Sequence, residues 1–488
     1  MMIRTIIFGT GTYLKKRVGM LPKEFNILAF ADNNSSLWGQ DFIGKKIISP
    51  DVISKFKYDI IIIAVSNKFF EEINNQLISL GIPASKIYSF EFITAMKKQG
   101  EIKYYGTNVH NFSADVIIIS NELNYTGAPM ACISAALVLK NNNKKVCIAA
   151  PSADLRLVRE INEKGIVVVV APALNLPGKK ELLLAKNCDF VLVNVYTNIS
   201  AACEFSKIKP VLWWVHETND IIHITNIIYH CNIIKPSFTG IHTVAVCENV
   251  KDNLNSVWPD LPVTIMNYGL LDFYNTKIKD KSKYYKINFA IIANIYTLKA
   301  QDVFVKAALE YFKICNVPAE FWMIGSGSKS EFFDEVMELS NKNPNIIWKG
   351  EMSREELESI YPQIDVVVCP SRHEGLPIAV NEGLMNAKVC IVADTAGDND
   401  YIIDGESGFL FHGEDVKGLS EKMKYVAENY ENLGEMRHNA RQVYLNHYSM
   451  DSFSERLNNE IELTIKNWRP NSKHSIFGNQ NLLETEAD

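Results

Sequence analysis

Two glutamates that stand eight residues apart, Glu374 and Glu382, have the residue type and spacing to bind a ligand. The apolar run from Val366 to Cys369 suits a buried parallel strand, and Pro377 favours the first turn of a helix. Glu374 is therefore expected in the loop at the carboxyl end of a strand, and Glu382 about a turn and a half into the next helix. Both acids could then face one crevice.

That crevice would suit a phosphorylated ligand. In open α/β sheets, ligands bind beyond the carboxyl ends of the strands, where a helix N-terminus attracts an anion such as a diphosphate. Carboxylates repel phosphates, so the useful partners of Glu374 and Glu382 would be neutral hydroxyl groups of a ribose or a sugar. The alternative is that both are solvated acids near a helix start.

The elements that must position these acids follow the alternation of a doubly wound α/β fold. Helical patterns separate the apolar runs, as expected when helices cover both faces of a parallel sheet. Strands are predicted at 115–119, 146–149, 166–170, 190–194 and 211–215 in one domain, and at 288–292, 321–324, 346–349, 366–369 and 388–392 in another.

The residues around the two acids resemble the E-x7-E signature region of glycosyltransferase family 4. The matching stretches are Pro370-Ser371, Glu374 to Pro377, Glu382 to Leu384 and Thr395 to Gly397. The resemblance covers about residues 115–467. It implies the GT-B fold, in which two Rossmann-like domains face each other and the C-terminal one holds a nucleotide-sugar donor. It also implies retaining sugar transfer that needs no metal and no other cofactor.

The resemblance implies three catalytic residues. Glu374 would hold hydroxyl groups of the donor sugar, and Lys299 would face the diphosphate. His216, expected at the end of a strand in the first GT-B domain, would contact the sugar from the opposite side. A histidine there could form a hydrogen bond or steady developing charge, although a lone histidine is more often structural.

The resemblance also implies a set of donor-binding residues, in which Glu382 would bind the ribose. Asn294 stands where the family usually has an arginine. One cationic contact is thereby lost, and the diphosphate must rely more on backbone N–H groups or on Arg372. The predicted donor-binding residues are Glu382, Arg372, Gly375, Leu376, Pro377, Gly127, Asn294 and Gly325.

The first 97 residues are predicted to form a small Rossmann-like unit of their own. Gly9, Gly11 and Asp32 fit part of a dinucleotide fingerprint, but Leu14 occupies the third glycine position. The unit also resembles the small Rossmann-like domains attached to polysaccharide-biosynthesis enzymes. It could hold a nucleotide, serve as a docking module, or contain a glycine turn without a ligand.

The predicted domains are 1–97, 115–271 on the acceptor side and 288–467 on the donor side. Residues 98–114 are expected to be a linker, 272–287 an interdomain connection and 470–488 a disordered tail.

Composition excludes several classes of protein. A net charge of −6 gives no indication of nucleic-acid binding. Nine cysteines without a C-x2-C pair favour buried free thiols in a reducing cytosol over zinc or disulfides. The N-terminus lacks the features of a signal peptide, and no apolar run is long enough to span a membrane. We expect a cytoplasmic protein, with peripheral association at the inner face of the membrane left open.

The sequence therefore predicts a retaining glycosyltransferase that moves a sugar from a nucleoside-diphosphate sugar to a glycan or lipid-linked acceptor in cell-surface polysaccharide biosynthesis. A sugar-nucleotide epimerase or a glycosyl phosphorylase would share the fold. An NAD(P)-binding oxidoreductase acting through Gly9 and Gly11, or a nucleotide-sugar binder without catalysis, are the alternatives from other classes.

Overall fold

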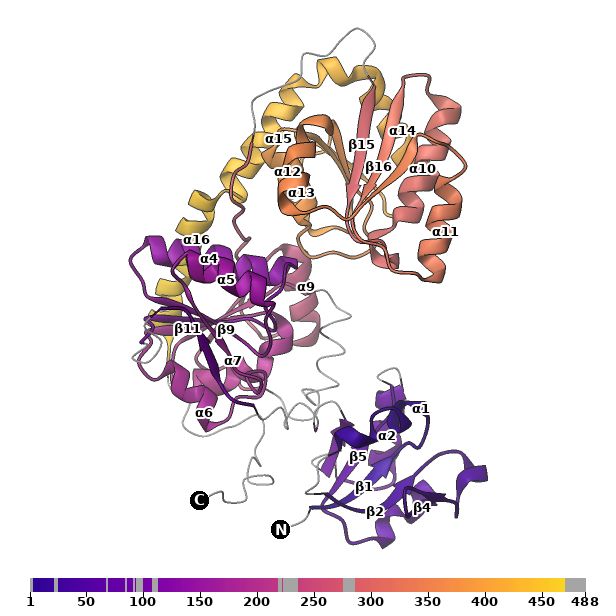
Figure 1. The fold of residues 1–488 in the computed structure, drawn as a ribbon, viewed down its shortest axis with the longest axis vertical. Coiled ribbons are helices and arrows are strands. Elements are labelled where there is room, and N and C mark those ends of the chain that lie inside the picture. The colour runs from indigo at the N-terminus through magenta and orange to yellow at the C-terminus, as the bar shows by residue number, and fades with distance from the viewer. Residues whose placement is uncertain are drawn as a thin grey trace.

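The computed structural model describes residues 3–21, 25–66, 69–83, 86–90, 93, 100–107, 113–217, 222, 236–274 and 286–469, except for the side chains of 398 and 399. Three sheets build three successive units (Figure 1). The predicted tail 470–488, Cys231 and most of the predicted connection 272–287 lie outside the described residues. The other eight cysteines are buried.

The N-terminal unit is a six-stranded sheet in the order β3-β4-β2-β1-β5-β6. All neighbours are parallel except β3 and β4, which form a hairpin. Its core strand is a run of four buried isoleucines, as a strand covered on both faces requires. Its elements are β1 (Ile3–Phe8), α1 (Thr12–Lys15), β2 (Phe25–Ala31), β3 (Asp41–Phe42), β4 (Lys45–Ile48), β5 (Ile60–Ile63), α2 (Phe70–Ser79) and β6 (Ile87–Ser89).

The second unit, here called the N-lobe, is built on an eight-stranded sheet in the order β14-β13-β12-β11-β8-β9-β10-β7. Its strands are β7 (Lys103–Tyr105), β8 (Val116–Ile119), β9 (Val146–Ala150), β10 (Val167–Val170), β11 (Phe190–Asn194), β12 (Val211–Val215), β13 (Ile241–Ala245) and β14 (Val263–Ile265). Its helices are α4 (Gly127–Asn141), α5 (Leu155–Glu163), α6 (Lys179–Leu182), α7 (Ile199–Ser206) and α9 (Glu248–Val257).

The prediction that 98–114 is only a linker is wrong. Strand β7 lies within it and pairs antiparallel with β10, so that Tyr104 faces Val169 across the ladder. The segment showed no period because it is a short edge strand with mixed polar and aromatic residues, which carries little of the alternation that marks a half-buried strand.

The third unit, here called the C-lobe, is a wholly parallel six-stranded sheet in the order β17-β16-β15-β18-β19-β20. Its strands are β15 (Ile287–Ile292), β16 (Ala319–Ile324), β17 (Ile346–Gly350), β18 (Val366–Cys369), β19 (Val389–Ala393) and β20 (Phe409–Phe411). Its helices are α10 (Gln301–Ile314), α11 (Glu331–Ser340), α12 (Arg354–Ile360), α13 (Ile378–Met385), α14 (Val416–Asn429), α15 (Gly434–His447) and α16 (Met450–Asn467).

In both lobes the strand order reverses beside the first parallel strand, between β8 and β11 in the N-lobe and between β15 and β18 in the C-lobe. Crossovers leave toward opposite faces at such a switch point, which opens a crevice at the carboxyl ends of those strands. The α/β prediction is confirmed, and the topology indicates where each lobe would bind a ligand.

The last helix, α16, leaves the C-lobe and runs along the N-lobe, against α4, β12 and β13 (Figure 1). Phe453 stacks on Trp214 with ring centroids 5.5 Å apart. Glu460 pairs with His242 and accepts a hydrogen bond from Thr264 Oγ1 at 3.1 Å. This helix therefore joins the C-lobe to the N-lobe.

Candidate active site

Lys299 and Glu374 meet at the switch point of the C-lobe. Lys299 ends a short 3-10 turn after β15, and Glu374 lies in the loop after β18. The Lys299 ammonium pairs with the Glu374 carboxylate, and each side chain is 17% exposed. Burial alone would lower the pKa of Lys299, but the neighbouring Glu374 carboxylate outweighs it, and the pKa is raised. Lys299 therefore carries its charge beside the crevice.

Ser371 and Thr395 orient Glu374. Ser371 Oγ donates to Glu374 Oε2 at 2.7 Å, and Thr395 Oγ1 donates to the Ser371 carbonyl at 2.6 Å. Both residues stood in the motif stretches that carried the resemblance, but neither was among the predicted site residues. The stretch from Thr395 to Gly397 thus supports the Glu374 loop from the next strand.

Arg372 has partners that the sequence did not predict. Its guanidinium pairs with Asp302, at 3.0 Å, and with Glu414, and it donates to the Thr297 carbonyl. Asp302 is in the first turn of α10, so Arg372 fastens the β18 loop to that helix. Its role toward a phosphate stays a prediction, and a phosphate would compete with these two carboxylates.

Glu382 is held by residues from α12 and from the turn that follows it. Arg354 pairs with its carboxylate, and the Tyr361 hydroxyl donates to Oε2 at 3.0 Å. The Glu382 side chain is only 2% exposed. Burial raises the pKa of Glu382, and Arg354 and Tyr361 oppose that rise.

The expectation that both acids face one open crevice is therefore not met at Glu382. It lies in α13, as predicted, but its carboxylate is buried and paired with Arg354. Arg354 and Tyr361 were not among the predicted site residues, because they are distant in the chain from the motif. Pro377 immediately precedes α13, one residue earlier than expected.

Asn294 and Gly325 lie together after the neighbouring strands β15 and β16. Asn294 Oδ1 accepts hydrogen bonds from Ser326 N and Oγ, at 3.1 and 2.8 Å. Gly325 has a φ of +146°, and a Cβ there would lie 2.2 Å from the Ala293 carbonyl oxygen. At the position where the family usually has an arginine, the side-chain amide of Asn294 therefore joins the loop after β15 to the loop after β16.

His216 immediately follows β12 in the N-lobe. Its ring lies near those of Trp214 and Tyr268, with centroids 4.6 and 6.3 Å away, and among the described residues Nε2 has no hydrogen-bond partner although it is buried. Burial lowers the pKa of His216 to about 3. The imidazole is neutral near pH 7, so it can form a hydrogen bond but cannot act as a cation. Glu217 accepts from the backbone N–H of Tyr196 at 2.7 Å and thus braces the adjoining turn.

The two lobes touch where His216 and Gly375 meet. A Cβ on Gly375 would lie 2.6 Å from the His216 carbonyl oxygen. A Cβ on Gly127, the first residue of α4, would lie 3.3 Å from Cδ1 of Ile378, the first residue of α13. The N-termini of two helices therefore approach each other from opposite lobes, and each favours an anion.

The predicted N-terminal nucleotide residues form an internal network. Asp32 Oδ2 accepts from Thr10 N and Oγ1, at 2.9 and 2.6 Å, and Oδ1 accepts from Asn34 N at 2.9 Å. Gly9, at the end of β1, has a φ of +102° and lies against Ala64 beyond β5. A Cβ on Gly11 would meet no atom within 4 Å. The bonds of Asp32 favour a structural turn, and nucleotide binding there stays a prediction.

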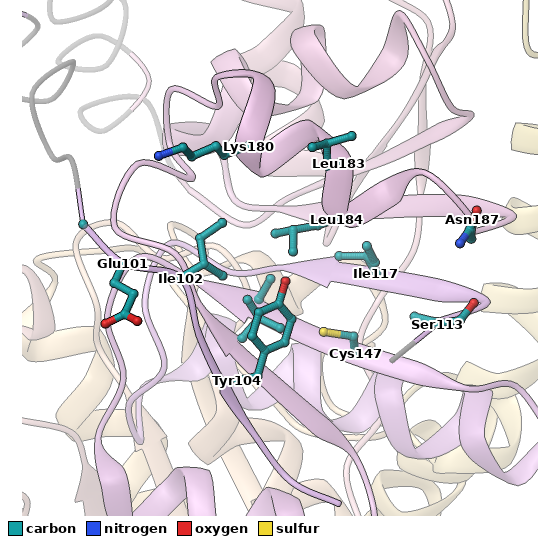
Figure 2. A pocket seen from close by; sticks show the side chains of 14 residues that line it. Glu101, Ile102, Tyr104, Ser113, Ile117, Cys147, Lys180, Leu183, Leu184 and Asn187 are labelled. Atoms are coloured by element: carbon teal, nitrogen blue, oxygen red, sulfur yellow. The ribbon is translucent and has the colours of Figure 1, made fainter. Parts of the chain in front are cut away.

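A separate cavity of about 430 Å³ lies on one face of the N-lobe sheet (Figure 2). Ile117 and Cys147 line its floor and Leu184 lies across from them, while Ser113 and Asn187 mark an end near the start of β8 and β11. None of the predicted site residues is among the described residues that line it. We therefore assign this cavity no part in the site.

Two further properties concern the whole of the described ranges. None of the helices in them is both long and apolar enough to cross a membrane. In the same ranges, no group of three His, Cys, Asp or Glu side chains could hold a metal ion. Metal independence stays a prediction.

Three family models match parts of the chain. Residues 275–443 match "Glycosyl transferases group 1", and residues 112–231 match "Glycosyl-transferase family 4". Residues 1–88 match "C2185-like, N-terminal". The predicted resemblance to family 4 is thereby confirmed.

Two curated relatives come from Staphylococcus aureus. A poly(ribitol-phosphate) alpha-N-acetylglucosaminyltransferase of strain COL is 22% identical over 183 residues, which is 37% of this chain and 36% of the relative. The capsular polysaccharide biosynthesis glycosyltransferase CapM is 24% identical over 243 residues, 47% of this chain and 63% of the relative. The chain thus spans less than two thirds of the length of each.

Among solved structures, Anabaena HepE in complex with UDP and glucose is similar, with a TM-score of 0.61 at 13% identity. The match covers 72% of this chain and 100% of HepE. Together with the family matches on the two lobes, it confirms the predicted GT-B fold.

Proposed function

We propose that this chain, in which two glycosyltransferase family matches coincide with the two lobes of a GT-B fold, is a retaining glycosyltransferase. It would move a sugar from a nucleoside-diphosphate sugar to a glycan or lipid-linked acceptor in cell-surface polysaccharide biosynthesis. The observation that supports this most directly is the buried Lys299–Glu374 pair at the C-lobe switch point, against which the N-lobe packs at His216. The names of CapM and of the poly(ribitol-phosphate) enzyme support a polymer as acceptor.

In the proposed reaction, the bond between the anomeric carbon and the diphosphate oxygen breaks, and negative charge grows on the departing phosphate. An ammonium group has three N–H donors, of which Lys299 uses one for Glu374. The others can meet phosphate oxygens, and a buried point charge there lowers the barrier. Lys299 and the N–H groups near Gly375 would replace a metal ion in neutralising the diphosphate.

The sugar would lie between the lobes. The Glu374 carboxylate has lone pairs left beside those that Ser371 and Lys299 occupy, and these can accept from sugar hydroxyls. The buried Nε2 of His216 can form a hydrogen bond from the opposite side. Glu382 would reach a ribose only after Arg354 moves, since Arg354 now occupies its carboxylate. With a lipid-linked acceptor, the chain would act as a peripheral protein at the cytoplasmic face of the membrane.

The first test is a thermal-shift panel of UDP-glucose, UDP-N-acetylglucosamine, GDP-mannose, NAD⁺ and NADP⁺ on the full chain. We expect one nucleotide sugar to raise the melting temperature of the wild type and to lose this effect in Lys299→Ala. A shift with NAD⁺ or NADP⁺ and with no sugar nucleotide would contradict the proposal.

The donor found in this way then tests the chemistry. We expect slow hydrolysis or transfer that EDTA does not inhibit, with a product whose anomeric configuration, read by NMR, matches that of the donor. Binding without turnover would indicate a nucleotide-sugar binder, and a donor epimerised without release of the nucleotide would indicate an epimerase.

A further inference from the structure

Three successive backbone carbonyls in the Glu374 loop accept hydrogen bonds from side chains of the opposite lobe. Asn249 Nδ2 donates to the Glu374 carbonyl at 3.3 Å. Cys247 Sγ donates to the Gly375 carbonyl at 3.2 Å, and the Tyr268 hydroxyl donates to the Leu376 carbonyl at 2.7 Å. The main chain beside the predicted catalytic acid is thus held from across the lobe boundary.

The packing around these bonds leaves little room for adjustment. A Cβ on Gly397 would lie 1.6 Å from the Gly375 carbonyl oxygen and 2.6 Å from Cys247 Sγ. Asp400, close to Gly397, accepts a hydrogen bond from Glu248 N at 3.1 Å and so caps the first turn of α9 from the C-lobe. The amino end of α9 is therefore fitted to two C-lobe loops at once.

We propose that Cys247, Asn249 and Tyr268 are positioning residues for the transfer reaction, because they hold the main chain at 374–376 in its working position only when the lobes are closed. This inference rests on the proposed function for its catalytic meaning. The three residues form a clasp that acts through Glu374 and the neighbouring peptides.

Through the clasp, closure of the two lobes sets the direction of backbone N–H groups in the Glu374 loop, because of the geometry of the peptide bond. In a trans peptide the N–H group points away from the C=O group, so holding the carbonyls of Glu374 and Gly375 also sets the directions of the next two N–H groups. Those N–H groups are the ones that the proposed function assigns to the diphosphate. Opening the lobes removes the three donors, and the loop then loses the constraints that orient it.

Two substitutions remove a donor with little change in shape. Asn249→Asp keeps the volume and favours the start of a helix, but its carboxylate cannot donate. Tyr268→Phe removes only the hydroxyl. We expect each to lower kcat for turnover of UDP-glucose, or of the panel member that the wild type turns over fastest, about tenfold, and to change KM less than about twofold. Ser256→Ala, on α9, removes a hydroxyl that donates to a carbonyl of the same helix; it is the matched control and should not change kcat.

Hydrogen exchange gives a readout that needs no activity. In the full chain carrying both substitutions, we expect the amides at 371–376 to exchange at least about fivefold faster, with exchange in β15 unchanged. Unchanged exchange in that loop, unchanged kcat in both single variants, or a loss confined to KM would overturn the clasp. If the wild type turns over no nucleotide sugar, the proposed function fails, and the exchange experiment still decides whether these residues position the loop.

Discussion

At the scale of residues, the Lys299–Glu374 ion pair lies beyond the carboxyl ends of the C-lobe strands, at the switch point between β15 and β18. Each side chain is largely buried, so neither charge is stable there without its partner or a ligand. The Ser371 hydroxyl also donates a hydrogen bond to the Glu374 carboxylate and so fixes its orientation. The pair is therefore a largely buried ion pair rather than a surface one, and we expect it to respond strongly to the loss of either charge.

Glu374→Gln keeps the shape of the side chain and removes its charge. Lys299 stays buried, and without the carboxylate its pKa falls. We expect donor turnover to fall about 100-fold and the alkaline limb of its pH profile to move to lower pH. Glu335→Gln, which removes an exposed carboxylate beside Lys306, is the control and should leave both unchanged. An unmoved alkaline limb in Glu374→Gln would contradict the role of the pair.

His216 should make the fold sensitive to acid. Its pKa is about 3 in the folded chain and about 6.5 when unfolded, so between these values the unfolded state binds more protons. Stability is therefore lost as pH falls below about 6.5, by up to about 1.4 kcal/mol per pH unit. We expect urea denaturation at pH 7, 6 and 5 to show a steeper decline for the wild type than for His216→Gln. Parallel declines would mean that His216 is not buried neutral.

At the scale of elements, loops at the carboxyl ends of the strands do the positioning. The loop after β18 packs on the loop after β19 through Gly375 and Gly397, and a parallel bridge joins Glu374 to Ala396. Glycine is required at 397 because the opposing carbonyl oxygen occupies the space of a side chain. Because these two loops lie close together, both contact the amino end of α9.

Gly397→Ala should separate these two loops. The added methyl group overlaps a backbone oxygen that cannot rotate away, so we expect a loss of about 1–3 kcal/mol in unfolding free energy and at least a tenfold drop in turnover. Gly434→Ala, in the first turn of α15, is the matched control. A Cβ there would lie 3.9 Å from the nearest side-chain atom, so the variant should keep or raise stability. Denaturant melts and donor turnover of the two variants give the comparison. Wild-type turnover in Gly397→Ala would show that the loops can part without cost.

At the scale of the whole molecule, α16 connects the C-lobe to the N-lobe. It follows α15 in the C-lobe, yet its buried face packs on the N-lobe. Phe453 is fully buried against Trp214, and Trp468 Nε1 donates to the Ser206 carbonyl at 3.1 Å. A helix that follows the C-lobe in the chain therefore holds the two lobes together.

Phe453→Ala leaves a cavity between α16 and the N-lobe. We expect a loss of about 3–5 kcal/mol in unfolding free energy, measured by denaturant titration. Leu463→Ala, on the same helix with 41% of the residue exposed, should cost less than about 0.5 kcal/mol. Equal effects of the two substitutions would indicate that α16 does not depend on its N-lobe contact.

Much of the fold could be predicted from the sequence alone. Buried parallel strands are continuous apolar runs, so 190–194 and 211–215 were predicted at the residues where β11 and β12 lie. The motif from Pro370 to Leu384 placed Glu374 in a loop and Glu382 on a helix, as found. These features are encoded locally, because a strand or a helix start depends on neighbouring residues.

Only the tertiary structure decided the partners of those residues. Arg354 reaches Glu382 across 28 positions, and Cys247 reaches the Gly375 carbonyl across 128. Periodicity specifies which face of an element is buried, but not which distant side chain meets it, since that depends on how the lobes and helices pack. For the same reason β7 became a strand only by pairing with β10, and Glu382 became a buried acid only because α12 lies over it.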